Sequence, residues 1–364
     1  MLRTSRRVRQ GPPWTANDNV GRNIHEARQL WFNRSSTQTV TTLTGFISGN
    51  ARCFGNVTGG DGKMYYVPFS RTAMATYDPA TDTFVFPQGN TLPAGAGMRG
   101  GCLAPNGKIF CLPTSTVYEA LEYDPVTDTS TLFGAGQYPA ISSGWQCPVV
   151  GPDGMVYGLP LSTNTILKID PNTRAITTFG DTGSNRYYAS VVGVDGKIYG
   201  IPNNTTKVLV LDVTVSPPTI EFFDAVQLGY NSGCVGPDGL IYALPQGTNQ
   251  MMWIDPVART SGLFGSTIAS GAYRGCKLAA DGKIYHTPHA ATQVMVVDPI
   301  ARTTTVFGTT FSTANKWRGA AMGREGAVYG SPYDSQSSFS LLRVPTVSVD
   351  LPQNIYASRY FGGL

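Results

Sequence analysis

The amino-acid sequence predicts an all-β protein built from a repeated unit. Turn-forming residues are abundant, long helical periodicities are scarce, and one sequence pattern recurs every 42 to 47 residues. Glycine and proline contribute 42 and 25 of the 364 residues, and only 14% of the residues are charged. This composition excludes a coiled coil and an acidic disordered chain, and no apolar run is long enough for a membrane-spanning helix.

Each part of the repeat corresponds to one structural element. The unit starts with Asp-Gly-Lys-Ile-Tyr, continues through an apolar run ending in Asp-Pro, and finishes with Thr-x-Thr and Phe-Gly. Asp-Gly supplies the positive φ angles of a tight hairpin, and Asp-Pro starts a later turn. β-branched residues before Phe-Gly suit an outer strand. The turn glycine recurs seven times, as Gly62, Gly107, Gly154, Gly196, Gly239, Gly282 and Gly326.

Seven units of four short strands predict a seven-bladed β-propeller with four-stranded blades. The seventh unit lacks the final Asp-Pro and Phe-Gly elements, whereas residues 37–46 have the pattern of a single strand before the first unit. We expect this N-terminal strand to complete the last blade and close the ring, because closure removes two exposed edges. The predicted regions are a basic arm (1–36), the propeller (37–345) and a C-terminal tail (346–364).

Positive charge is concentrated in the arm, which carries five net positive charges while the rest of the chain is nearly neutral. A short helix is predicted over residues 23–34. Its apolar face either packs under the propeller or anchors the protein to another protein. The residues expected to anchor a partner are Arg3, Arg6, Arg7, Arg9, Trp14, Leu30 and Trp31.

The arm also bears on compartment and partners. Residues 1–14 lack the apolar stretch of a secretory signal peptide, so ordinary secretion is not indicated. We expect neither membrane insertion nor nucleic-acid binding, because seven arginines with only two interleaved tryptophans are a weak nucleic-acid signal.

The cysteines do not form a metal-binding pattern. No Cys-x-x-Cys pair occurs, so a zinc cluster is not expected. We interpret them as small buried residues, and disulfides between neighbouring blades remain an alternative. The six positions are Cys53, Cys102, Cys111, Cys147, Cys234 and Cys276.

The Asp-Gly-x-Ile-Tyr and Ile-Asp-Pro-x-Thr elements resemble the repeats of streptogramin lyases and related bacterial seven-bladed propellers, over about residues 50–345. The lyase family uses a histidine and glutamates around a magnesium ion. Here His286 and His289 flank Pro288, but no glutamate lies close in that unit. We therefore carry over no catalytic residue, metal ligand or cofactor, and interpret the two histidines as polar residues at the rim.

The repeats also resemble those of large propellers from bacteria and their phages. A propeller with a basic arm and an apolar tail looks most like a virion component, either a tail-fibre or a decoration protein. The resemblance implies a non-enzymatic structural or interaction protein. It would dock on other structural proteins of a large assembly through residues 1–36 and 346–364, and contact the host surface. A cytoplasmic protein, a lyase-type enzyme and a glycan-binding module are the alternatives.

Arginine or an aromatic residue recurs just before the first strand of each unit. The first strand of a propeller blade lines the central channel, so these residues should gather at the channel mouth, opposite the Asp-Gly turns. Arginine beside aromatic rings suits a surface glycan or an anionic ligand, whereas the alternative is that the arginines brace adjacent blades. The candidate ligand-binding residues are Arg52, Arg99, Trp145, Arg186, Tyr230, Arg274, Trp317 and Arg318.

Overall fold

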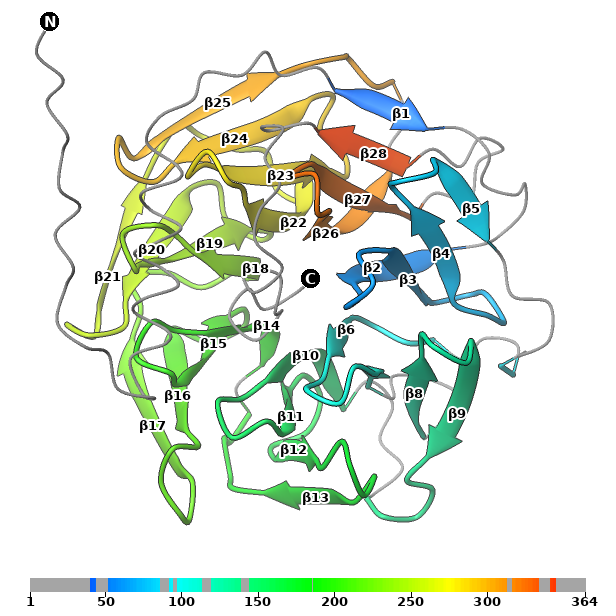
Figure 1. The fold of residues 1–364 in the computed structure, drawn as a ribbon. Helices are drawn as coiled ribbons and strands as arrows, with labels where there is room; N and C mark the ends of the chain where they lie inside the picture. The colour runs from blue at the N-terminus through cyan, green and yellow to red at the C-terminus, as the bar shows by residue number, and fades with distance from the viewer. Residues whose placement is uncertain are drawn as a thin grey trace, which may run out of the picture.

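The computed structural model describes residues 40–43, 52–85, 92–93, 97–112, 119–138, 144–184, 186–312, 316–333 and 341–344. Within these ranges, seven four-stranded antiparallel sheets are arranged around a common axis (Figure 1). The predicted seven-bladed propeller is confirmed. The arm with its helix and the tail lie outside the described residues. In the described part of the chain, no helix has the length and apolar character needed to cross a membrane.

The first three blades follow the chain from the axis outwards. The first blade contains β2 (Cys53–Thr58), β3 (Met64–Pro68), β4 (Ala75–Asp78) and β5 (Thr83–Val85). The second contains β6 (Gly101–Leu103), β7 (Ile109–Cys111), β8 (Ala120–Asp124) and β9 (Thr129–Phe133). The third contains β10 (Trp145–Val150), β11 (Val156–Pro160), β12 (Ile166–Ile169) and β13 (Ile176–Phe179).

The next three blades repeat this order. The fourth blade contains β14 (Tyr187–Val192), β15 (Ile198–Pro202), β16 (Lys207–Asp212) and β17 (Thr219–Asp224). The fifth contains β18 (Tyr230–Val235), β19 (Ile241–Pro245), β20 (Met251–Asp255) and β21 (Thr260–Phe264). The sixth contains β22 (Tyr273–Leu278), β23 (Ile284–Pro288), β24 (Val294–Asp298) and β25 (Thr303–Phe307).

The seventh blade joins the two ends of the propeller. It contains β26 (Trp317–Met322), β27 (Val328–Pro332), β28 (Leu341–Val344) and, at its outer edge, β1 (Thr41–Leu43). β1 pairs antiparallel with β28, with Thr41 opposite Arg343 (Figure 1). Val40, just before β1, is buried, and its carbonyl accepts a hydrogen bond from Thr309 Oγ1 at 3.3 Å. The N-terminal strand therefore closes the ring, as expected.

Local hydrogen bonds of the aspartate side chain stabilise the Asp-Gly turns. In the first blade, Asp61 Oδ1 accepts a hydrogen bond from the Lys63 amide at 3.1 Å, and its Oδ2 accepts one from the Tyr65 hydroxyl at 2.8 Å. Gly62 follows with φ of 85°. The aspartates of the repeat therefore act in turn formation, which leaves them unavailable as a ring of ligand-binding carboxylates.

Apolar side chains fill the spaces between adjacent blades. All six cysteines lie in this buried interior as free thiols. The interpretation of the cysteines as small buried residues is confirmed, and the structure contains no disulfide between them.

Candidate functional site

The candidate site is formed at the start of the innermost strand of each blade. The innermost strands β2, β6, β10, β14, β18, β22 and β26 surround the axis (Figure 1). In six of the seven blades, the register between the innermost strand and its neighbour shifts at this point. Such a bulge bends the strand and re-aims its side chains.

Two successive residues in each blade take opposite directions. The residue nine positions before the turn glycine packs between blades and is at most 5% exposed: Cys53, Met98, Trp145, Tyr187, Tyr230, Tyr273 and Trp317. The next residue lines a cavity on the axis, the central channel, and the seven together are Phe54, Arg99, Gln146, Tyr188, Asn231, Arg274 and Arg318.

In four of the seven blades the following residue is glycine, which allows neighbouring inner strands to approach closely: Gly55, Gly100, Gly275 and Gly319. Gly275 has φ of 128°, a conformation that residues with a side chain rarely adopt. A Cβ atom at this position would lie 2.5 Å from the carbonyl carbon of Gly319 in the next blade. The backbone of β22 and that of β26 therefore meet directly beside the channel.

The predicted arginines of the site fall into three groups. Arg99, Arg274 and Arg318 come together in the channel. Arg52 does not line the cavity, and its guanidinium carbon lies 5.5 Å from the Tyr333 ring centroid. Arg186 is exposed and does not line the cavity.

The three aromatic candidates lie elsewhere. The side chains of Trp145, Tyr230 and Trp317 are buried between blades, so their expected position at the channel mouth is wrong. Trp145 Nε1 donates a hydrogen bond to the Thr165 carbonyl at 2.6 Å. The physical reason is the alternation of side chains along a strand, which sends neighbouring residues to opposite sides.

Sequence reasoning missed four of the seven channel residues, namely Phe54, Gln146, Tyr188 and Asn231. They are chemically diverse, so residue type gives no signal. Counting eight positions back from each turn glycine would have found them.

Aromatic rings support the arginines. The Arg318 guanidinium carbon lies 3.8 Å from the Tyr333 ring centroid and 5.0 Å from that of Phe54. Arg99 lies 5.7 Å from Phe54 and 5.5 Å from Phe69. The three rings contact one another, with centroids 5.8 to 6.1 Å apart. Cation–π contacts of this kind favour the charged guanidinium without neutralising it.

The channel arginines lack a compensating negative charge among the described residues. The Nε atoms of Arg99, Arg274 and Arg318 are buried without a hydrogen-bond partner, and no described carboxylate pairs with these side chains. No hydrogen bond from them to a described backbone carbonyl is seen, so the bracing alternative gains no support. Burial, and then the charge of Arg274, lowers the pKa of Arg318 to about 10. Burial also lowers the pKa of Arg274.

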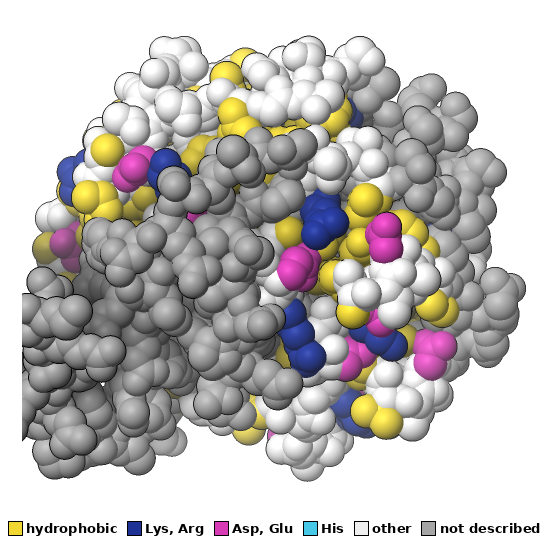
Figure 2. Space-filling view, turned by 45° about the horizontal axis from the view of Figure 1, so that its top comes forward, with side chains coloured by type: hydrophobic (Ala, Val, Ile, Leu, Met, Phe, Trp, Pro, Cys, Tyr) yellow, Lys and Arg dark blue, Asp and Glu magenta, His cyan; other side chains and the backbone are white. Residues whose placement is uncertain are grey.

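Several cations elsewhere on the propeller are paired with carboxylates. The buried carboxylate of Glu122 accepts two hydrogen bonds from Arg174, each at 2.9 Å, and one from Lys108 at 2.6 Å. The hydrogen bonds from Arg174 lower the pKa of Glu122. In the coloured part of Figure 2, basic and acidic side chains are interspersed across the surface. The channel cluster therefore differs from the cations around Glu122, which share a buried carboxylate.

The opposite side of the cavity carries neutral amides. Gln146 is 2% exposed, and its Nε2 donates to the Tyr188 carbonyl at 3.3 Å. This bond leaves the Gln146 Oε1 atom buried without a partner, as is Asn231 Oδ1. The cavity between the two sides has a volume of about 50 Å³.

Both histidines of the sixth blade are buried. His286 is fully buried next to Tyr273, and neither of its ring nitrogens has a hydrogen-bond partner. His289 is also buried, with Nδ1 3.2 Å from the Trp317 carbonyl oxygen. Burial lowers the pKa of both histidines to about 3. The interpretation of His286 as a polar rim residue is wrong, because its strand places it inside the blade. Among the described residues, no group of three or more His, Cys, Asp or Glu side chains could hold a metal ion.

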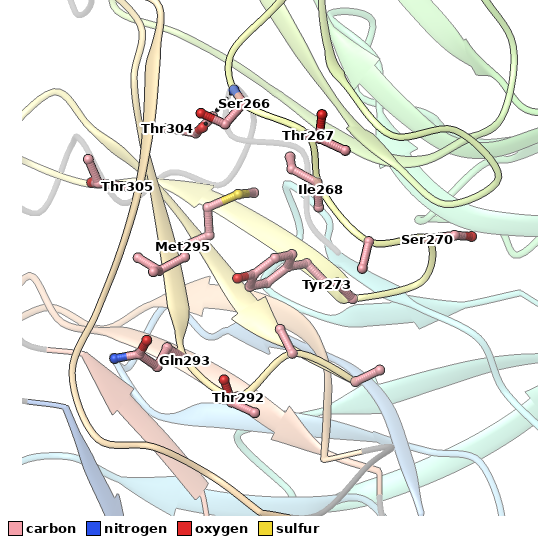
Figure 3. A pocket seen from close by; sticks show the side chains of 15 residues that line it. Ser266, Thr267, Ile268, Ser270, Tyr273, Thr292, Gln293, Met295, Thr304 and Thr305 are labelled. Carbon is pink, nitrogen blue, oxygen red and sulfur yellow. Dashed lines mark hydrogen bonds between the residues drawn. The ribbon is translucent and has the colours of Figure 1, made fainter.

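A second cavity, of about 550 Å³, lies in the sixth blade (Figure 3). Its lining has no charged side chain and combines the apolar Ile268, Tyr273 and Met295 with hydroxyl groups such as those of Thr292 and Thr304. In the seventh blade, the larger Phe311 packs on Trp317 with ring centroids 4.7 Å apart. Ile268 and Phe311 occupy equivalent places, since the Ile268 amide donates to the Asn249 carbonyl and the Phe311 amide to the Thr292 carbonyl. The Ile268 side chain is the smaller of the two.

Solved structures share this architecture. A streptogramin B lyase superposes with a TM-score of 0.67 at 15% sequence identity, over 86% of this chain and 99% of the other. A catalytically inactive virginiamycin B lyase from Staphylococcus aureus with quinupristin gives 0.70 at 11% identity, over 85% and 100%. Their fold is the fold of this chain. The propeller also matches the extracellular domain of a hybrid two-component system from B. thetaiotaomicron, with a TM-score of 0.63 at 10% identity over 87% and 42%.

These similarities establish the fold of the propeller alone, because the identities are low. No protein-family model matches the sequence, and no curated protein matches it.

Proposed function

We propose that this protein is a non-enzymatic interaction propeller that binds an anionic group in its central channel. The observation that carries the proposal is the cluster of Arg99, Arg274 and Arg318, which come from three blades and have no described carboxylate partner. A buried, uncompensated positive charge is unfavourable, and an anion placed among these guanidinium groups would relieve both their repulsion and their desolvation. Anion binding would therefore remove an unfavourable electrostatic free energy that the unliganded propeller already carries.

The geometry favours binding over the lyase-type alternative. A general acid or base must reach its substrate, and a pKa near the working pH makes proton transfer efficient. His286 is enclosed in its blade, and His289 is buried against the backbone of Trp317. The glycan-binding alternative depended on Trp145 and Trp317, whose burial leaves them no face to offer a sugar.

The wider role in the proposal is attachment to a larger assembly. Residues 1–36 and 346–364 would dock the propeller on other structural proteins of a phage virion, leaving the channel mouth to contact an anionic group on the host surface. The support for docking is the arginine-rich composition of the arm and the apolar tail. Size fractionation of native material with limited proteolysis tests this part. Co-migration with a large particle that protects residues 1–36 is expected, and a free species with an equally labile arm contradicts it.

Anion binding itself is tested by calorimetric titration of the full chain with inorganic phosphate, sulfate and acetate, at ionic strength held constant with sodium chloride. The wild type is expected to bind at least one of these anions, and Arg274→Gln and Arg318→Gln are expected to lose that binding. Arg186→Gln is the matched control, since this arginine is exposed and outside the channel. Equal binding by all four proteins, or by none, would overturn the proposal.

A further inference from the structure

We infer that the central channel selects a phosphate group over a sulfate or a carboxylate. This inference rests on the proposed function and specifies its ligand. Three features of the site carry it: the size of the cavity, the arrangement of its cations, and the unpartnered amide oxygen of Gln146.

The cavity restricts what can enter between the arginines. Its volume is about 50 Å³, whereas a single water molecule needs at least about 10–15 Å³. Three to five water-sized atoms therefore fit, which matches one oxyanion. A larger ligand would place its terminal anionic group between the arginines.

The cations favour a tetrahedral, multiply charged anion. The guanidinium groups of Arg99, Arg274 and Arg318 approach from the second, sixth and seventh blades. A planar carboxylate is satisfied by one fork-shaped guanidinium and offers a single charge. A tetrahedral oxyanion presents oxygens in several directions, and a dianion offsets two of the three positive charges. The Coulombic balance therefore favours phosphate or sulfate over acetate.

Gln146 distinguishes phosphate from sulfate. Gln146 lines the cavity, and its Nε2 donates to the Tyr188 carbonyl, which leaves Oε1 as a buried acceptor without a hydrogen-bond partner. An acceptor oxygen repels an oxyanion unless a proton lies between them. Hydrogen phosphate carries such a proton near neutral pH, whereas sulfate is fully deprotonated. Gln146 Oε1 can accept a hydrogen bond from phosphate alone among the three anions.

The test compares two pairs of oxyanions on the full-length wild-type protein by calorimetric titration at pH 7. Phosphate and arsenate, which retain a proton, are expected to bind about tenfold more tightly than sulfate and selenate, because a hydrogen bond to a charged group contributes enough for that difference. In Gln146→Met, the preference is expected to fall to about twofold or less. The wild-type comparison alone decides the matter if this variant does not fold.

The outcomes separate the inference from the proposed function. Equal affinity for phosphate and sulfate, or tighter binding of acetate, overturns the inference and leaves the anion site standing. Loss of binding for every anion overturns both. Glycerol 3-phosphate identifies the source: affinity equal to that of inorganic phosphate indicates the end group of a larger molecule, and binding of inorganic phosphate alone indicates the free ion.

Discussion

Replacing Arg318 by glutamine should stabilise the free propeller while abolishing its anion binding. Arg318 lies among Arg274, Arg99 and Arg52, and its charge is both desolvated and repelled. Glutamine keeps a polar side chain of moderate length and removes the charge. A ligand-binding site often lowers the stability of the unliganded protein. Removing the charge of Arg318 should therefore raise the free energy of unfolding.

The pKa of Arg318 gives the magnitude. It falls from 12.5 to about 10, and each unit of pKa corresponds to about 1.4 kcal/mol, so the charged side chain costs about 3 kcal/mol. Because the folded-state pKa is lowered, this cost is fully present below pH 10 and disappears between pH 10 and 12.5. Loss of the cation–π contacts with Tyr333 and Phe54 subtracts about 1–2 kcal/mol. The expected net gain in the free energy of unfolding is about 1–2 kcal/mol.

Urea unfolding at pH 7.5, followed by tryptophan fluorescence, measures this gain. Phosphate at about 100 times its dissociation constant should stabilise the wild type by about 2.7 kcal/mol and leave Arg318→Gln unchanged. The Arg186→Gln control should stay within about 0.5 kcal/mol of the wild type and keep the response to phosphate. The reasoning fails if the free energy of unfolding of Arg318→Gln lies more than about 1 kcal/mol below that of the wild type and the variant is still stabilised by phosphate. The charge of Arg318 would then not destabilise the free propeller.

Three further predictions concern the fold. The His286 pKa of about 3, against 6.5 unfolded, means that the unfolded chain binds the extra proton first, so stability should fall as the pH drops below 6.5. This histidine alone should cost about 3 kcal/mol at pH 4 relative to pH 7, and urea unfolding of His286→Phe at both pH values should show a correspondingly smaller difference. Gly275→Ala should lower the free energy of unfolding by about 3 kcal/mol or more, because its Cβ would meet the Gly319 backbone. Gly271→Ala, with open space around it, should lower it by about 1 kcal/mol. Equal losses of stability in thermal unfolding would argue against close strand packing. A chain that starts at residue 37 should unfold cooperatively. One that starts at residue 45 should lose this behaviour because β28 then keeps β27 but has no partner on its outer edge. Equal circular-dichroism melting curves would contradict ring closure.

The sequence predicted the fold because its signals are local. Asp61-Gly62 forms a turn with its own neighbours, through hydrogen bonds to Lys63 and Tyr65. Turn chemistry of this kind acts within a few residues and is readable in each repeat. The missing strand of the seventh unit and the isolated strand at residues 37–46 likewise predicted the pairing of β1 with β28.

The sequence located the candidate site only to within one residue. Arginine at positions 99, 274 and 318 was recognised, but Trp145 and Trp317 were assigned to the same surface as those arginines. Successive side chains on a strand point to opposite sides, so a shift of one position moves a side chain from the core to the channel. In six of the seven blades a bulge at the start of the innermost strand sets that choice, and its register follows from pairing with the adjacent strand.

The sequence by itself determined the number of blades, the turns and the strand that closes the ring, since each depends on contacts between near neighbours or on the count of repeats. The tertiary structure alone decided that arginines from the second, sixth and seventh blades share one cavity with Gln146. It also decided that these arginines lack a described carboxylate partner while the cations around Glu122 are paired. The physical reason is that electrostatic compensation depends on distances in space between residues of different blades, which no local pattern specifies.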